Sequence, residues 1–256
     1  MIDTHAHLDS DEFRDDLEAV LERAAAAGVE AIVSVAVSAA SAEAIVALAD
    51  RRPQVFAAVG IHPNYVHEAA PNDWDRVVAL VDHPRVTALG ETGLDRHWDV
   101  APFDLQQEYF ARHLELSRRT GLPVIVHTRD CEADALAMIG EAARYGPLRG
   151  VMHSFTGTPA AAAQYLEWGL FISFAGMTTF KKSQELRDTA RGIPADRILI
   201  ETDSPYLSPH PLRGKRNEPA NVALTAQVLA DARGESLSDF VAQTSANARR
   251  LLPRLR

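Results

Sequence analysis

Met1-Ile2-Asp3-Thr4-His5-Ala6-His7 opens the chain with a short run that leads into two histidines spaced two residues apart. Side chains two apart on a strand share a face, so His5 and His7 would project together while Ala6 points away. Four further residues of metal-ligand type also follow apolar runs. They are Glu91 after Val86–Gly90, His127 after Leu122–Val126, His153 after Val151-Met152, and Asp203 after Ile198–Ile200.

Such apolar runs are typical of buried parallel strands, and strand-like and helix-like segments alternate along the chain. Ser41 is expected to cap the helix after the second strand. Further helices follow the eighth strand, near Asn221–Arg233 and Leu237–Leu252. The eight predicted strands are Ile2–His7, Ala31–Val37, Val55–Ile61, Val86–Glu91, about 122–127, Gly150–His153, Leu170–Phe174 and Arg197–Ile200.

Eight strands that alternate with helices predict an α/β fold, a single (β/α)8 TIM-type barrel domain over residues 1–256, because each parallel crossover needs a helix on the outside. A doubly wound open sheet is the structural alternative. The six metal-ligand residues favour the barrel, since side chains after strands one, four, five, six and eight converge only if the sheet closes into a ring. In such a barrel they would meet at the carboxyl ends of the strands.

Four imidazoles and two carboxylates are too many ligands for one tetrahedral ion. They suit two adjacent divalent ions that share a bridging carboxylate and a water. Taken singly, each residue also has a structural explanation, such as a hydrogen-bonded histidine or an aspartate that caps a helix. Six together favour a metal site, because burying so many polar groups without an ion would be costly. Four other histidines are predicted to be solvated: His67, His83, His97 and His113.

The composition excludes several classes of protein. At 256 residues, with 46% hydrophobic and 24% charged residues, the chain is not of the disordered class. It has no apolar stretch of membrane-spanning length, and because a strand is predicted from Ile2 we expect no signal sequence. The single cysteine, Cys131, fits a reducing compartment, and we expect a cytoplasmic protein with an unreactive thiol. A net charge of −9 argues against non-specific coating of nucleic acid but permits a local basic rim.

Seven short polar motifs occur in order along almost the entire chain. They are Asp3-Thr4-His5-Ala6-His7, Gly60-Ile61-His62-Pro63, Gly90-Glu91-Thr92-Gly93-Leu94-Asp95, His127-Thr128-Arg129, His153-Ser154-Phe155-Thr156-Gly157, Glu201-Thr202-Asp203-Ser204-Pro205-Tyr206 and Arg213-Gly214-Lys215-Arg216-Asn217-Glu218-Pro219. This series resembles the motifs of TatD-type metal-dependent deoxyribonucleases, in the metal-dependent hydrolase superfamily. The chain departs from the family at Arg96, where an aromatic residue is common, which leaves substrate contact by that loop open.

The resemblance implies a (β/α)8 barrel that hydrolyses phosphodiester bonds in DNA, commonly as a 3′ to 5′ exonuclease, here on single-stranded ends. It also implies that His5, His7, Glu91, His127, His153 and Asp203 bind divalent metal. From ligand type and strand position, we expect His5, His7, Glu91 and Asp203 to hold one ion and Glu91, His127 and His153 the other. Glu91 would bridge the two ions, and Asp203 would orient the attacking water and accept its proton. Mixed nitrogen and oxygen ligands leave Mg²⁺, Mn²⁺ and Zn²⁺ open.

A phosphate substrate calls for positive and donor groups around the metals. Arg213, Lys215 and Arg216 follow the eighth strand and are candidate phosphate clamps, although an ordinary solvated basic loop would look the same. The protein's binding partner would be DNA, as substrate. We expect no membrane association and no stable protein partner. The remaining candidate substrate contacts, placed by their strand-end positions, are His62, Asp95, Arg129, Ser154 and Tyr206.

Two other functions fit the same residues. Barrels that begin with a His-x-His pair also include metal-dependent amidohydrolases, which would cleave a cyclic amide or another C–N bond. Glu91 in the bridging position and the basic cluster of Arg213, Lys215 and Arg216 favour phosphoesters over amides. A non-catalytic scaffold is the second alternative, and six converging metal-binding groups argue against it.

Overall fold

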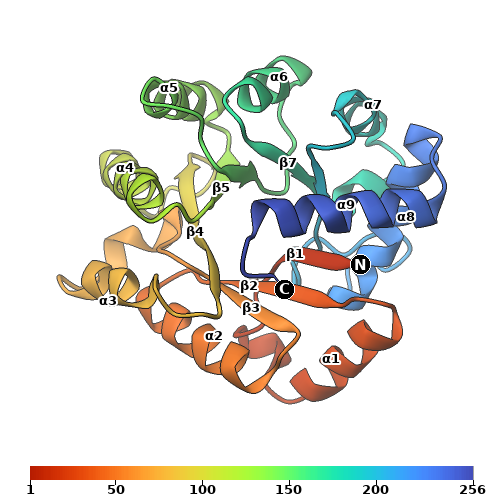
Figure 1. Cartoon of the computed structure of the whole chain (residues 1–256), viewed down its shortest axis with the longest axis horizontal. Coiled ribbons are helices and arrows are strands. Elements are labelled where there is room, and N and C mark those ends of the chain that lie inside the picture. Colours follow the sequence, from red (N-terminus) through yellow and green to blue (C-terminus); the bar gives the residue numbers. More distant parts are fainter. Residues whose placement is uncertain (256) are drawn as a thin grey trace.

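A single closed ring of parallel strands forms the centre of the molecule (Figure 1). The computed structural model describes residues 1–255. All seven neighbouring pairs from β1 to β8 are parallel, and a parallel bridge between Ala6 and Ser204, just beyond the end of β8, completes the ring. The predicted barrel is therefore confirmed. The strands are β1 (Ile2–Ala6), β2 (Ala31–Val35), β3 (Val55–Val59), β4 (Val86–Asp95), β5 (Val124–Arg129), β6 (Gly150–Met152), β7 (Phe171–Phe174) and β8 (Ile198–Ile200).

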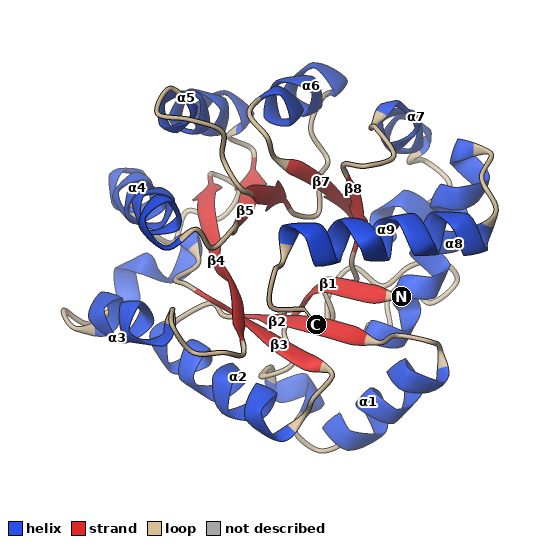
Figure 2. Ribbon diagram, in the orientation of Figure 1, coloured by secondary structure: helices blue, strands red, loops and turns tan. Residues whose placement is uncertain are grey.

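Helices surround this ring and connect its strands (Figure 2). They are α1 (Leu17–Ala26), α2 (Ala39–Arg51), α3 (Asp73–Leu80), α4 (Phe103–Thr120), α5 (Glu132–Ala143), α6 (Pro159–Glu167), α7 (Gln184–Gly192), α8 (Val222–Arg233) and α9 (Leu237–Leu251). Short 3-10 turns are η1 (Asp11–Phe13), η2 (Pro63–Glu68), η3 (Gly176–Thr179) and η4 (Pro219–Asn221). None of the helices in residues 1–255 has the length and apolar character needed to cross a membrane.

Two local predictions about helices are wrong. The cap of α2 is Ser38, whose side chain accepts a hydrogen bond from the backbone N–H of Ser41, whereas Ser41 itself bonds Asp9. His113 is fully buried on α4 and not solvated. Its Nδ1 donates to the carbonyl oxygen of Tyr109 at 2.7 Å, and its Nε2 accepts from the N–H of Ile61 at 3.2 Å. The buried ring of His113 therefore has hydrogen bonds at both nitrogens. The bond with Ile61 joins residues far apart in the sequence and could not be predicted from it.

Strands β4 and β5 run further than predicted, to Asp95 and Arg129. Their outer halves pair with each other, and Gly93 lies opposite His127. A side chain at Gly93 would place its Cβ 2.0 Å from the carbonyl oxygen of His127. The two strands can approach here only because the residue is glycine. The same glycine interrupts the apolar pattern, which is why the pattern ended too early.

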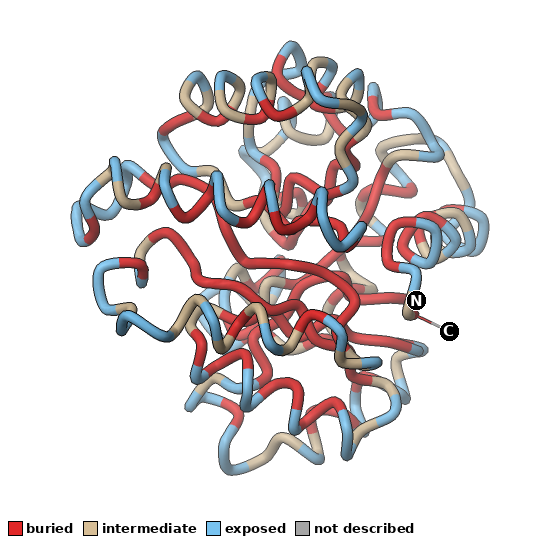
Figure 3. Tube along the Cα trace, turned by 60° about the vertical axis from the view of Figure 1, so that its left-hand side comes forward, coloured by how far each residue is buried: buried red, intermediate tan, exposed pale blue. Residues whose placement is uncertain are grey.

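The hydrophobic core has two layers, one inside the ring and one between the strands and the helices. Figure 3 shows the buried segments concentrated along the strands, with exposure alternating along the helices. Side chains such as Val33, Phe56 and Leu199 fill the interior and form one cluster with Leu251, Leu252 and other residues of the C-terminal segment. Figure 2 shows α9 crossing one end of the barrel. The C-terminal segment therefore seals the end opposite the strands' carboxyl ends.

Candidate metal centre

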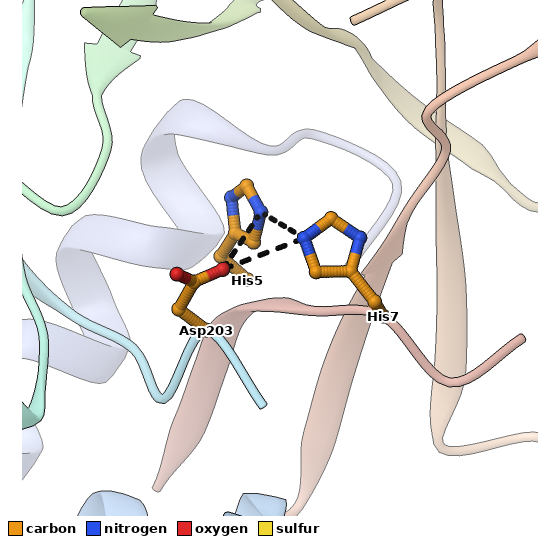
Figure 4. A group of neighbouring side chains, drawn as sticks. All are labelled: His5, His7 and Asp203. Atoms are coloured by element: carbon orange, nitrogen blue, oxygen red, sulfur yellow. Dashed lines mark hydrogen bonds and ion pairs between the residues drawn. The ribbon is translucent and has the colours of Figure 1, made fainter. Parts of the chain in front are cut away.

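His5, His7 and Asp203 meet at the carboxyl ends of the first and last strands (Figure 4). The Nε2 atoms of His5 and His7 lie 3.2 Å apart, and Asp203 Oδ1 lies 3.6 Å from the first and 3.4 Å from the second. Glu91 from β4 completes this first ligand group, with Oε2 at 3.3 Å from His5 Nε2 and 3.6 Å from His7 Nε2. Ligands bound at about 2.0–2.1 Å in a tetrahedron stand about 3.3 Å apart, so the donor set fits a single divalent ion.

A second ligand group lies beside the first and shares Glu91. Glu91 Oε1 is 3.0 Å from His127 Nδ1 and 2.9 Å from His153 Nε2, and these two nitrogens are 3.3 Å apart. The two oxygens of one carboxylate thus face different ligand groups. That arrangement suits a carboxylate bridging two ions.

Three of the ligand histidines are held in one tautomer by a fixed acceptor. His7 Nδ1 is 2.9 Å from the carbonyl oxygen of Val35, His127 Nε2 is 2.9 Å from Asp95 Oδ2, and His153 Nδ1 is 3.2 Å from Glu201 Oε1. Because these oxygens accept, the imidazole nitrogens donate, and the opposite nitrogen of each ring is the one directed into its ligand group, where it could bind an ion in place of a proton. This is the orientation that a metal-binding histidine requires.

His62 differs from the four ligand histidines, although its Nε2 lies 3.5 Å from Glu91 Oε1. Its Nδ1 accepts a hydrogen bond from the backbone N–H of Asn64 at 3.1 Å. Burial lowers the pKa of His62, so the ring is neutral and its one proton sits on Nε2. His62, Glu91 and His127 lie close enough together to form a candidate metal group, but with its proton on Nε2 the ring acts as a hydrogen-bond donor at the edge of the second ligand group.

The charges in the centre favour cations. Burial opposes ionisation of Glu91, but the surrounding imidazoles, His153 foremost, hold the pKa of Glu91 well below its ordinary value. Burial also favours the neutral form of His7 and so lowers its pKa. The contact with Asp203 and the charge of Glu91 outweigh burial and raise this pKa to about 9. Buried carboxylates therefore attract positive charge to the ligand nitrogens. A divalent cation would supply that charge in place of protons.

A cavity of about 630 Å³ opens above both ligand groups. Its lining includes His7, Glu91, His127, His153 and Asp203, and the Asp203 backbone adopts a left-handed conformation with φ of 56°. Three exposed aromatic side chains form its rim: Tyr65, Trp98 and Tyr206, with exposed fractions of 41%, 53% and 54%. The guanidinium of Arg129 lies over the Trp98 ring, 5.7 Å from its centroid. The candidate metal ligands thus lie under a cavity mouth lined by aromatic and cationic groups.

Residues 2–253 match the model of the TatD related DNase family. This chain belongs to that family. The uncharacterized metal-dependent hydrolase YabD of Bacillus subtilis (strain 168) is 37% identical over 251 residues, which cover 98% of each chain. The uncharacterized metal-dependent hydrolase YcfH of Escherichia coli (strain K12) is 38% identical over 254 residues, 98% of this chain and 95% of the relative. The crystal structure of YjjV, a TatD homologue from Escherichia coli K12, has a TM-score of 0.92 and 31% identity, covering 99% and 98% of the two chains.

Membership of the TatD-related family makes this chain a metal-dependent hydrolase, as the motifs predicted. The geometry brings together all six residues that the sequence proposed as metal ligands. Of the proposed substrate contacts, His62, Arg129, Ser154 and Tyr206 line the cavity.

Asp95 also lines the cavity, but its carboxylate is already occupied. Oδ2 accepts from His127 and from the side-chain amide of Asn64, and Oδ1 accepts from the backbone N–H groups of His97 and Trp98. Asp95 is therefore placed to orient His127 and the loop that carries Trp98. The neighbouring Arg96 turns outward, where it pairs with Asp134 and lies 3.5 Å above the Phe103 ring.

The three proposed phosphate clamps of this TatD-family chain lie outside the cavity lining. Arg216 bonds both carboxylate oxygens of Asp16, at 2.7 and 2.8 Å. Arg213 lies over the Phe180 ring at 4.6 Å, and Lys215 is exposed on the same loop. Arg216 is thus engaged in a structural ion pair, while the other two cations face solvent.

Sequence reasoning did not single out Glu201, which is buried and bonds both His153 Nδ1 and the backbone N–H of Ser154. Its signal was available, since Glu201 and Asp203 repeat the two-residue spacing of His5 and His7. Cys131 is buried, and burial raises the pKa of its thiol to about 11, which fits the predicted unreactive cysteine.

Proposed function

We propose that this chain hydrolyses phosphodiester bonds in DNA, trimming single-stranded ends from the 3′ terminus, with two divalent ions. The observation that carries the proposal is Glu91, whose two oxygens face separate ligand groups beneath one cavity. His5, His7, Glu91 and Asp203 would hold one ion, and Glu91, His127 and His153 the other. The chemistry that such ions supply is Lewis acidity, which lowers the pKa of water and neutralises charge on a phosphoryl group.

Asp203 is suited to orient the attacking water and to accept its proton. One of its oxygens lies between His5 and His7, and Figure 4 shows the second oxygen directed away from both rings. Burial opposes ionisation, but the His7 contact and the neighbouring imidazoles lower the pKa of Asp203. The carboxylate is therefore ionised near neutral pH, as a general base must be.

His62 is suited to donate from Nε2 to a phosphoryl oxygen in the cavity, because its proton is fixed on that nitrogen. Arg129 would add positive charge, and Ser154 a hydroxyl. Tyr65, Trp98 and Tyr206 offer faces on which unpaired bases can stack, which favours single strands over duplex. Arg213 and Lys215 remain candidates for contacts with more distant phosphates. Free Cys131 supports action in the reducing cytoplasm.

The test is a nuclease assay on end-labelled single-stranded DNA, duplex DNA and RNA. The protein is stripped of metal and then restored separately with Mg²⁺, Mn²⁺ or Zn²⁺, and a panel of cyclic amides is assayed in parallel. We expect metal-dependent release of nucleotides from the 3′ end of single-stranded DNA. Hydrolysis of the amides alone would establish the C–N alternative instead, and tight metal binding without turnover of any substrate would point to a scaffold.

A further inference from the structure

A second and larger cavity, of about 1120 Å³, opens beside the metal centre. It runs between α6 and α7, and we call it the α6–α7 groove. It shares four lining residues with the metal cavity: Thr128, Arg129, Thr156 and Met177. The two spaces are therefore adjacent along a common wall. The volume exceeds the roughly 300–1,000 Å³ of ordinary small-molecule pockets, which favours a segment of polymer as the occupant.

The walls of the α6–α7 groove are mostly apolar. Ala162, Ala163 and Leu166 line it from α6, and Leu186 lines it from α7. Tyr165 also contributes to the lining, and its buried hydroxyl has no hydrogen-bond partner among residues 1–255. An unpaired buried hydroxyl is costly unless a ligand satisfies it. Apolar walls with one spare donor suit the faces and edges of nucleobases.

Cationic side chains lie at one edge of the groove, although the whole chain has a net charge of −9 and the lining includes four carboxylates. All three lysines of the chain, Lys181, Lys182 and Lys215, lie in the loops that follow β7 and β8. Lys182 lines the groove, and Arg213 lies over Phe180, which lines it too. In the part of the chain that the structure describes, no carboxylate lies within ion-pair distance of Lys181, Lys182 or Arg213.

Most of the acidic side chains in the lining are already engaged. Glu132 accepts hydrogen bonds from the backbone N–H and hydroxyl of Thr158, and Asp130 contacts His97 Nδ1 at 2.9 Å. Asp188 pairs with Arg191 at 2.6 Å. Glu185 is exposed. Among the described residues, none of these carboxylates lies within ion-pair distance of Lys181 or Lys182, so both lysines remain available to phosphate groups.

We propose that the α6–α7 groove binds the single-stranded polynucleotide that continues away from the bond being cleaved, an inference that rests on the proposed nuclease function. Bases would lie against the apolar walls, and the phosphates would face Lys181, Lys182 and Arg213. Arg129, which lines both cavities, would hold the strand where it passes from one to the other.

The test compares kcat/KM for a thymidine dinucleotide and for an oligothymidylate of about twelve nucleotides. The wild-type protein should prefer the longer substrate by about tenfold or more, since each stacked base adds affinity. Ala163→Trp, which fills the groove, and Lys182→Glu, which repels phosphate, should reduce this ratio to about one to three. Matched controls are Ala160→Trp, exposed on α6 but outside the lining, and Arg119→Glu, exposed on α4. Both should retain the wild-type ratio.

Thermal unfolding of each variant checks that the fold is retained. DNA hydrolysis whose length preference is absent, or is unchanged by both groove variants, would overturn the inference while leaving the nuclease proposal intact. Absence of DNA hydrolysis at any length would defeat the nuclease proposal. In that case, binding of the labelled oligothymidylate is measured by fluorescence anisotropy in the presence of a chelator. Weaker binding by both groove variants than by the wild-type protein supports a strand-binding groove, and equal binding excludes it.

Discussion

Three of the four candidate ligand histidines have a hydrogen-bond acceptor behind the ring, and these acceptors come from distant parts of the chain. Val35 on β2, Asp95 on β4 and Glu201 after β8 hold the rings of His7, His127 and His153. The convergence of the candidate ligands could be predicted from the sequence because each follows an apolar run. Most of the partners could not, because a carbonyl such as that of Val35 becomes an acceptor only through the curvature and pairing of the folded strands.

Asp203→Asn should lower turnover by about 10²–10⁴-fold, because the amide cannot accept a proton from water. The metal content should be largely preserved, since the amide oxygen and the three other members of the first ligand group remain. Turnover is measured alongside metal analysis of the purified variant. A variant with full activity would exclude the general-base role of Asp203.

His113 gives the fold a dependence on pH that is separate from catalysis. Burial lowers the pKa of His113 from 6.5 to about 4, so the folded protein keeps it neutral while the unfolded chain protonates it below about 6.5. The stability that it contributes is present above pH 6.5 and is lost as the pH falls toward 4. Between pH 7 and pH 5 this loss is about 2 kcal/mol.

His113→Gln should remove that loss while keeping an acceptor for the Ile61 N–H. Chemical denaturation at both pH values measures the effect as a difference between wild type and variant. The wild-type advantage should be smaller at pH 5 than at pH 7 by about 2 kcal/mol. An advantage that is equal at the two pH values would show that His113 is not held neutral.

At the scale of single elements, the close contact of β4 with β5 places the metal ligands. Gly93→Ala would push a methyl group against the carbonyl oxygen of His127, and it would also strain a backbone with φ of 138°. Gly146→Ala is the matched control, because Gly146 has φ of 127° and open space around it. The control should cost about 1–3 kcal/mol from backbone strain alone, and Gly93→Ala about 2 kcal/mol more.

Denaturant unfolding of both glycine variants measures these costs. A metal titration should show weaker binding only for Gly93→Ala, because the strand that carries His127 must move. Equal stability of the two variants would mean that β4 and β5 relax apart without cost.

The order and type of the elements could be predicted from the alternation of apolar runs and amphipathic segments. Strand ends could not, because Gly93 breaks the apolar pattern within β4 while serving the close pairing of that strand with β5. The contacts of the cationic side chains in the loop after β8 could not be predicted from the sequence either. Arg213, Lys215 and Arg216 share one sequence motif, yet Arg216 is bound to Asp16 through contacts that local sequence does not reveal.

Across the whole molecule, closure of the ring could be predicted because six ligand-type residues needed a common meeting point. The position of α9 across the far end could not, since an amphipathic pattern shows that a helix packs but not where. Leu252 joins the interior cluster at that end, and Leu252→Ala should cost about 2–4 kcal/mol of unfolding free energy. Turnover below the unfolding temperature should stay unchanged, because the metal centre lies at the opposite end.

Leu237→Ala, at the exposed start of α9, is the control and should change stability by about 0.5 kcal/mol or less. Chemical denaturation and steady-state turnover of both variants are the measurements. Loss of turnover in a folded Leu252→Ala protein would show that the two ends of the barrel are coupled.

The closed end of the barrel also limits the path by which a reaction product can leave. Because apolar side chains fill the axis of the barrel and the C-terminal segment closes the end opposite the metal centre, a mononucleotide released by the proposed exonuclease would have no exit at that end. The product would have to leave through the mouth of the metal cavity, where the next DNA 3′ end enters. For an exonuclease built this way, nucleoside monophosphates should compete with fresh ends, and steady-state trimming should slow as they accumulate.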